Sequence, residues 1–314
     1  GSEFMPPLEE GDFLYMPNAD PGLSITKAKE LLQQTDRLIY QFPEVTSVMG
    51  KIGRSETATD PAPLTMIETT IMLQRDKSKW RRVPTDGFLG LFPGSRPITL
   101  EELVDGYELP DGQRVPGIND ALNIPGLTGA LTRGSMPIKT RIDMLATGIR
   151  TAVGIKVMGD DLAAITAVSE EIARVLQTDE NIRKYTASAY SDKLTGGNYV
   201  DINIDRAAAA RYGLTVADVQ DVIMSALGGA TVTWTVEGRE RYPVNIRYPR
   251  ELRDNVAALA EVLVPTPSGA QIPLSQLAAL RIHQGPPAIK TENARPNAWV
   301  YVDLKDMDVG TWMK

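Results

Sequence analysis

Hydrophobic and polar residues alternate along the first part of the chain in a strand–helix–strand order. The pattern predicts strands at 13–16, 45–50 and 68–73. Between the first two strands, apolar residues at helical spacing predict an amphipathic helix. Ser24 is its expected N-cap, and Pro43 is expected to end it.

The same order returns in the second half of the chain. Strands are predicted at 153–158 and 182–187, and a helix opening at Asp160-Asp161 lies between them. A last alternating strand at 298–304 is expected to return to this unit. Two units of similar length suggest a duplicated split βαβ, ferredoxin-like module. The helix is expected to bury one apolar stripe, formed by Leu162, Ile165, Val168, Ile172, Val175 and Leu176.

Two further segments interrupt these units. Residues 81–133 are rich in Pro and Gly but contain scattered apolar residues, which predicts an ordered excursion with short helices near 99–104 and 117–122. Residues after Gly196-Gly197 predict a small α+β insert. Its expected elements are a strand at 199–204, helices at 206–212 and 215–227, a hairpin joining 232–236 to 242–248, and strands at 262–266 and 272–274.

Composition narrows the class of protein. With 314 residues the chain is long enough for two or three domains with their own cores. The net charge of −7 argues against a nucleic-acid surface, which requires a basic stripe. No apolar run approaches the ~20 residues of a membrane helix, and no leader sequence is recognisable. We expect the chain to be cut from a longer protein, and the absence of cysteine suits an oxidising compartment.

Eleven methionines stand beside one histidine and no cysteine, so thioether sulfur is the main soft donor available to a metal. Thioethers are neutral and polarisable, and they suit Cu(I) and Ag(I) better than Zn(II) or Mg(II). Methionine is more often a core filler. Four methionines fit apolar periodicity and are interpreted as core residues: Met49, Met72, Met158 and Met224.

Three other methionines, Met16, Met66 and Met144, have polar neighbours and lie near strand ends. If they converge from their separate segments, they would form a neutral trigonal site for a soft monovalent cation. Spacing alone does not establish convergence, and from the residues alone the interpretation as core methionines comes first.

Other chemistry has little support in the sequence. His283 is the only imidazole, and we expect an exposed loop histidine there and not a ligand. Without a second histidine or a cysteine, nucleophilic catalysis has few candidate residues. Gly228-Gly229 lacks the Lys-Ser/Thr of a phosphate-binding loop. These residues therefore give little support for an enzyme.

Several motifs, in order along nearly the whole chain, resemble the second large periplasmic loop of heavy-metal RND efflux pumps. Within that family the resemblance is greatest to the copper and silver exporters. The motifs are EFMPPLEEGD at 3–12, ETATD at 56–60, RIDM at 141–144, GIR at 148–150, GIKV at 154–157, ARYGLTVADV at 210–219 and KTENARP at 290–296.

The resemblance implies an α+β fold with two ferredoxin-like porter subdomains and a docking subdomain inserted in the second. The expected boundaries are 1–135 for the first porter subdomain, 136–194 with 285–314 for the second, and 195–284 for the docking subdomain. The parent protein would be a trimeric, proton-driven antiporter of the bacterial inner membrane, with this chain in the periplasm. The chain would then be part of a secondary active transporter and not an enzyme. It would work with a periplasmic adaptor and an outer-membrane channel, and would need no cofactor beyond its cargo.

The resemblance also implies a site. In copper and silver exporters three methionines bind the ion in the porter cleft, and they match Met16, Met66 and Met144. Cleft-lining residues of the family match Asp60, Glu68, Arg141 and Arg150. The carboxylates could attract the cation, and the arginines could fix loops by pairing with acids. A divalent-metal exporter, a soluble metal-binding module and an assembly domain with core methionines remain as alternatives.

Overall fold

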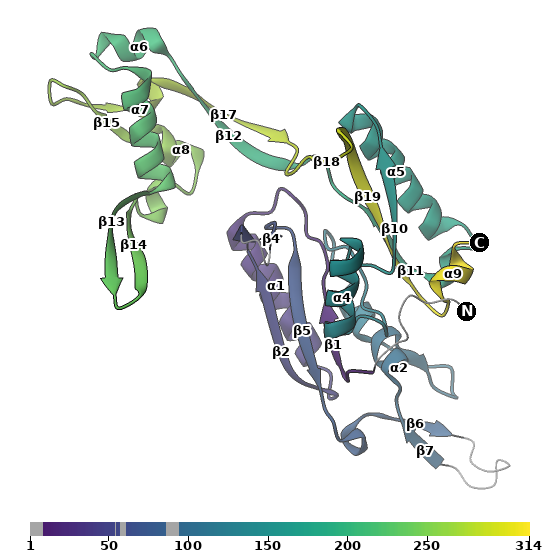
Figure 1. Cartoon of the computed structure of the whole chain (residues 1–314). Helices are drawn as coiled ribbons and strands as arrows, with labels where there is room; N and C mark the ends of the chain where they lie inside the picture. Colours follow the sequence, from purple (N-terminus) through teal and green to yellow (C-terminus); the bar gives the residue numbers. More distant parts are fainter. Residues whose placement is uncertain (1–8, 54, 57–60, 86–93) are drawn as a thin grey trace. The chain divides into compact units, whose positions relative to one another are not determined.

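The computed structural model describes residues 9–53, 55–56, 61–85 and 94–314. These residues form two compact units (Figure 1). The first unit comprises the chain up to Gly197 together with Gly285–Lys314, and the second comprises Asn198–Gln284. Each unit has its own hydrophobic core.

One sheet of the first unit has the order β1-β5-β2, formed by Asp12–Tyr15, Ile67–Leu73 and Val45–Ile52. Both outer strands run antiparallel to β5, so β1 and β2 are parallel to each other and α1 (Ile25–Tyr40) connects them. This is a split βαβ unit with β5 as its central strand. Ser24 caps α1 as predicted, because its side chain accepts a hydrogen bond from the Lys27 amide.

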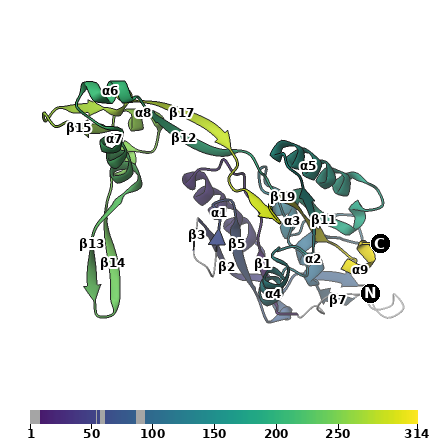
Figure 2. The ribbon, with the colours of Figure 1, turned by 45° about the horizontal axis from the view of Figure 1, so that its top comes forward.

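The second sheet of the first unit repeats this arrangement with the order β10-β19-β11. Its strands are Val153–Met158, Arg295–Leu304 and Thr186–Ser191, and the short β18 (Lys290–Glu292) also pairs with β19. Helix α5 (Leu162–Thr178) packs on β11 and β19, whereas α1 packs on β2 of the first sheet (Figure 2). The predicted return of the last strand to this sheet is confirmed.

Two sequence predictions for this sheet are wrong. Val168 and Val175 are 50% and 38% exposed, because the buried face of α5 passes through the small residues Ser169 and Ala173. The returning strand was expected at 182–187 but begins only at Thr186, since a 3₁₀ turn at Arg183–Tyr185 precedes it.

The described residues of the segment after β5 pack into the first core, as predicted. It contributes Leu103, Ile118 and Leu131, which are fully buried together with Phe13 and Ile71. Its short helices, at 100–105 and 118–121, lie where the sequence predicts them. The remaining strands and α-helices of the first unit are β3 (Ser55–Glu56), β4 (Pro61–Ala62), β6 (Arg82–Thr85), β7 (Gly94–Pro97), α2 (Leu100–Asp105), β8 (Tyr107–Glu108), β9 (Arg114–Val115), α3 (Ile118–Ala121), α4 (Pro137–Thr147) and α9 (Val309–Trp312).

The second unit is a small α+β assembly, and the predicted capping box of Thr215 and Asp218 is present at the start of α7. His283 is exposed as expected, but it lies on a strand, where its ring stacks on Tyr199 and Nδ1 lies 3.1 Å from Asp201 Oδ2. The elements are β12 (Gly197–Ile204), α6 (Arg206–Arg211), α7 (Val216–Ile223), β13 (Ala230–Glu237), β14 (Glu240–Ile246), α8 (Val256–Ala260), β15 (Leu263–Pro265), β16 (Gln271–Pro273) and β17 (Ala278–Gly285).

The four methionines interpreted as core residues are exposed, so that interpretation is wrong. Their exposed fractions are 69% for Met49, 47% for Met72, 37% for Met158 and 65% for Met224. For the methionines on strands, the reason for their exposure is that successive side chains point to opposite faces of the sheet. The neighbouring side chain points into the core instead, as Ile71 does beside Met72.

Helices and antiparallel sheets are segregated within each unit, so the chain is α+β as predicted. The predicted division of the first unit into two porter subdomains stays a prediction. Among the helices of the described ranges, none combines the length and the apolar character that a membrane crossing requires.

Replacing Ile71 by Ala tests the role of the central strand. Ile71 is fully buried in β5, so we expect the first unit to lose about 2–5 kcal/mol of unfolding free energy in urea. Met72→Ala is the matched control, because Met72 is the next residue of the strand and is 47% exposed. It should change stability by no more than about 0.5 kcal/mol. Equal losses in the two variants would contradict the assigned faces of β5.

Candidate functional site

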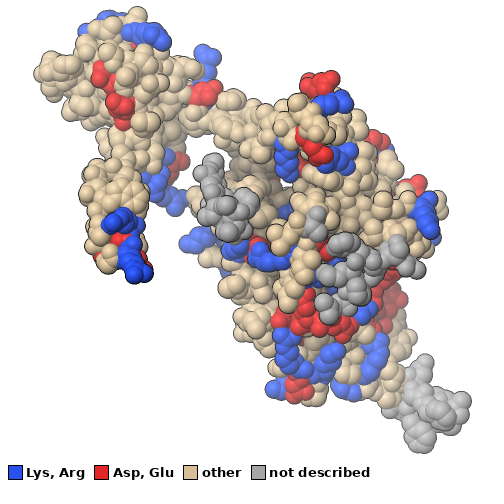
Figure 3. Space-filling model, viewed as in Figure 1, with Lys and Arg blue, Asp and Glu red and all other residues tan. Residues whose placement is uncertain are grey.

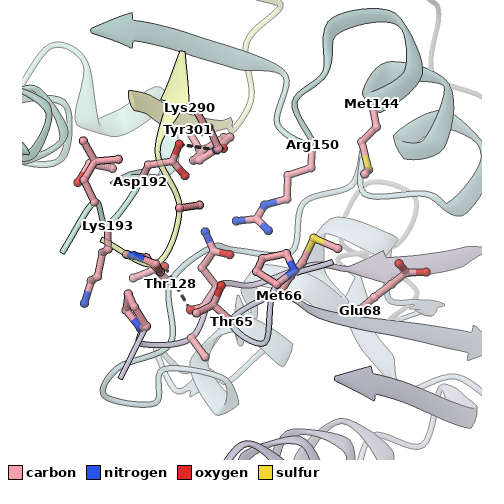
Figure 4. Close-up of a pocket in the computed structure, with 18 of the residues that line it drawn as sticks. Thr65, Met66, Glu68, Thr128, Met144, Arg150, Asp192, Lys193, Lys290 and Tyr301 are labelled. Atoms are coloured by element: carbon pink, nitrogen blue, oxygen red, sulfur yellow. Dashed lines mark hydrogen bonds and ion pairs between the residues drawn. The ribbon is translucent and has the colours of Figure 1, made fainter. Parts of the chain in front are cut away.

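A cavity of about 790 Å³ lies within the first unit (Figure 4). Segments of both sheets line it. Met66 lies directly before β5, Met144 lies on α4, Arg150 precedes β10, and Tyr301 lies on β19. The cavity is therefore built by residues that are distant in sequence and that the two central strands bring together.

Two of the three predicted methionines line this cavity. Met66 forms an isolated bridge with Asn18, and the Ile67 amide donates to the Pro17 carbonyl at 3.2 Å. Met144 lies in the last turn of α4, which ends because Gly148 takes a left-handed conformation at φ +75°. Both side chains are partly exposed, and Figure 4 shows them extending into the same open space.

The third predicted methionine, Met16, follows β1 and is 8% exposed. As formed by the described residues, the cavity lining does not include it. Met16 is nevertheless followed in sequence by two residues that pair with the segment at 66–67, namely Pro17 and Asn18. Its participation in a site stays a prediction. Asp60, the predicted cleft-lining carboxylate, lies outside the described residues.

Glu68 lines the cavity from β5 and is only 7% exposed. Its carboxylate forms ion pairs with Arg141 on α4 and with Lys51 on β2, where Lys51 Nζ lies 3.3 Å from Oε2. Two cations therefore neutralise this buried carboxylate. The expectation that an arginine fixes this region by pairing with an acid agrees with the Arg141 contact.

Arg150 is held by tyrosines. Its Nε and Nη2 donate to the Tyr190 hydroxyl at 3.1 and 3.0 Å. Its guanidinium also lies over the Tyr190 and Tyr301 rings, at 5.6 and 5.3 Å from their centroids. Within the described ranges, no carboxylate lies at ion-pair distance from Arg150. The buried Asp303 carboxyl acts on Arg150 only at longer range, so Arg150 is a cation at the cavity wall without an ion-pair partner among the described residues.

No local sequence pattern indicated the tyrosines that hold this arginine. Tyr190 and Tyr301 face each other across β11 and β19, with ring centroids 5.4 Å apart. Burial raises the pKa of Tyr190 and of Tyr301, so both hydroxyls stay protonated at neutral pH. The alternation of residues 298–304 puts Tyr301 on one face of its strand. Its pairing with Tyr190, however, depends on the register between β11 and β19, which the sequence pattern does not contain.

Asp303, two residues after Tyr301, is a second group that the sequence did not indicate. Burial raises the pKa of its carboxyl, although hydrogen bonds from the Ser188 hydroxyl and the Ala130 amide act in the opposite direction. The Ala130 amide donates at 3.3 Å. Asp303 thus links β11 and β19 to the segment around residue 130.

The donor set of the cavity decides which ions it could hold. Met66 and Met144 provide neutral thioether sulfurs, which suit soft monovalent cations. Across the part of the chain that the structure describes, no group of three or more His, Asp or Glu residues is arranged to hold a metal ion.

Residues 1–85 and 119–311 match the model of the AcrB/AcrD/AcrF family. Over 309 residues the chain is 45% identical to the cation efflux system protein CusA of Escherichia coli strain K12, covering 98% of this chain and 26% of that protein. It is 44% identical to the putative cation efflux system protein SilA of Salmonella typhimurium, with the same coverage.

A more distant relative and a solved structure are likewise named for metal resistance or metal efflux. The cobalt-zinc-cadmium resistance protein CzcA of Cupriavidus metallidurans is 28% identical over 319 residues, covering 100% of this chain and 27% of that protein. A crystal structure of a heavy metal efflux pump matches with a TM-score of 0.76 and 25% identity, covering 99% of this chain and 29% of that one. The chain spans about a quarter of the length of the curated relatives it matches.

The raised pKa of Asp303 predicts a pH dependence. Because the folded state binds this proton more tightly than the unfolded state, the stability that the group contributes is present at low pH. That stability is lost as the pH rises through the folded-state pKa. The unfolding free energy of the parent minus that of Asp303→Asn should therefore fall from about pH 4, near the ordinary Asp pKa, to neutral pH.

Urea unfolding of the first unit at several pH values measures this difference. Asp111→Asn, at an exposed carboxylate of the same unit, is the control for loss of one charge. A parent-minus-Asp303→Asn difference that is constant across the pH range would contradict the burial-raised pKa.

Proposed function

Because the chain belongs to the AcrB/AcrD/AcrF family, we propose that it is the ion-binding periplasmic portion of a proton-driven pump that exports Cu(I) or Ag(I). The observation that carries the proposal is the presence of Met66 and Met144 in one cavity of the first unit. Two thioethers from separate elements at one wall of a cavity are poorly explained as core filling.

The physical advantage of such a site is its charge. Neutral sulfur donors bind a soft monovalent cation without burying several anions beside it, which would be costly before the ion arrives. Methionine also binds weakly enough at each sulfur for the ion to leave again. Both properties suit a protein that picks up and releases its cargo.

Met16 is the proposed third donor. It directly precedes Pro17, whose carbonyl accepts the Ile67 amide beside Met66. Since the Met16 side chain is buried at 8% exposure, ion binding would require it to change rotamer toward the cavity. Met66 and Met144 would then bind first, and Met16 would complete the coordination.

A pump for divalent heavy metals is the alternative within the family. CusA and SilA, which are named as cation efflux system proteins, share 45% and 44% identity with this chain, whereas the cobalt-zinc-cadmium resistance protein CzcA shares 28%. The thioether donors also favour Cu(I) or Ag(I) over a divalent metal. A soluble metal-binding module without transport is a further alternative, which membrane segments in the parent gene would exclude.

The proposed parent is a trimer in the bacterial inner membrane that works with a periplasmic adaptor and an outer-membrane channel. The second unit supports a role in assembly through its β13–β14 hairpin. Figure 3 shows few charges along this hairpin and several at its tip. Its exposed apolar side chains would be covered in an assembly, and they include Val232, Trp234, Val236, Tyr242, Val244 and Ile246.

Silver titration of the purified chain in chloride-free, non-coordinating buffer tests the site. Met66→Ile and Met144→Ile should each weaken Ag(I) binding about tenfold or more, because each removes a direct ligand. Met72→Ile is the matched control, since Met72 is 47% exposed on β5 and lies outside the cavity lining formed by the described residues. Isothermal titration calorimetry gives the affinities.

Two results would overturn the proposal. Equal silver affinity in the parent and in Met66→Ile would exclude the cavity as the ion site. Tighter binding of Zn(II) than of Ag(I) would favour the divalent-metal pump. Met16→Ile in the same series tests the third donor separately.

A further inference from the structure

The charge of the cavity is opposite to what a cation site would suggest. Among the described lining residues, four side chains are cationic and two are anionic. The six charged residues are Glu68, Asp192, Arg141, Arg150, Lys193 and Lys290. A cation that enters with its full charge would meet a wall that is already positive.

Local ion pairs do not remove this excess. Glu68 is shared by Arg141 and Lys51, and Asp192 pairs with Lys290 at 2.7 Å. Outside the lining, Asp20 pairs with Lys193 at 3.2 Å. Each carboxylate in this set is thus already paired with at least one cation. Among the described residues Arg150 forms no ion pair, and the buried Asp303 carboxyl, whose pKa burial raises, acts on it only at longer range.

Arg150 is also positioned to bind an anion. Its Nε and Nη2 contact the Tyr190 hydroxyl, and the Tyr190 and Tyr301 rings fix the guanidinium plane. A guanidinium carries five N–H donors, so donors remain on Nη1 and Nη2 after the contacts to Tyr190. Arg150, Met66 and Met144 all line the same cavity, as Figure 4 shows.

Two positive charges in one partly enclosed cavity repel each other more strongly than in water. Neutral thioethers do nothing to offset this, because they leave the full charge on the ion. A monoanion between the ion and Arg150 would neutralise one charge and accept the remaining N–H donors. The cavity volume of about 790 Å³ leaves room for such a co-ligand.

We propose that the cavity binds the soft cation together with a halide ion, which Arg150 holds and which coordinates the metal directly. The inference rests on the proposed function and adds a second ligand to it. A halide fits better than a carboxylate or phosphate because soft Cu(I) and Ag(I) accept halides as direct ligands, whereas hard oxygen anions coordinate them poorly. The cargo would then be a metal–halide unit with a lower net charge than the bare ion.

X-ray absorption at the copper edge tests this with the whole chain loaded anaerobically with Cu(I) in bromide. Bromide scatters strongly and is distinct from sulfur. The parent should show both Cu–S and Cu–Br scattering. Arg150→Gln should require about tenfold more bromide for the same Cu–Br signal, because it removes a charge-assisted hydrogen bond.

Two further variants keep the result interpretable. Arg150→Lys retains the charge and should retain the Cu–Br signal. Arg174→Gln removes an exposed cation on α5 that pairs with Glu171 and should behave as the parent does. Retained Cu–S scattering in each variant shows that the methionine site is still formed.

The outcomes separate this inference from the proposed function. Cu–S scattering without Cu–Br at saturating bromide would overturn the halide site and leave the methionine site standing. Cu–Br scattering that is equal in the parent and in Arg150→Gln would show halide carried by the metal alone and would overturn the role of Arg150. Absence of Cu–S scattering in the parent would overturn both.

Discussion

The register between β11 and β19 is the constraint on which the cavity depends. It sets Tyr190 opposite Tyr301, and the same register along β19 sets Tyr301 opposite Gly154 of β10. Side chains alternate across a sheet, so a slip of one residue would turn Tyr301 to the other face. Arg150 would then lose the Tyr301 ring and keep only Tyr190. The pairing of β11 with the central strand β19 therefore fixes the position of Arg150, and β5 positions Glu68.

Local sequence signals predicted most elements because capping and periodicity act over a few residues. Ser24, the Thr215–Asp218 capping box and the strand at 153–158 were all placed correctly. It was harder to predict which side chains of a strand face the core. The exposed Met72 and the buried Ile71 are both apolar and adjacent, so apolar character alone could not tell which one points inward.

The site could be predicted only in part, for a related reason. Thioether chemistry and family resemblance identified Met66 and Met144, which the structure brings to one cavity. The tyrosine pair that holds Arg150 depends on strand register between segments more than a hundred residues apart, and no local pattern encodes it. The positive excess of the cavity wall likewise emerges only when side chains from several elements are placed together. This excess is the observation behind the proposed co-bound anion.

The proposed ion site requires that a soft cation bind between Met66 and Met144 in this cavity. Anomalous diffraction from crystals of the chain grown with one equivalent of Ag(I) would locate the ion. We expect one dominant silver peak inside the cavity, within bonding distance of the sulfur atoms of both residues. A dominant peak at exposed methionines such as Met49 or Met224, with the cavity empty, would contradict it.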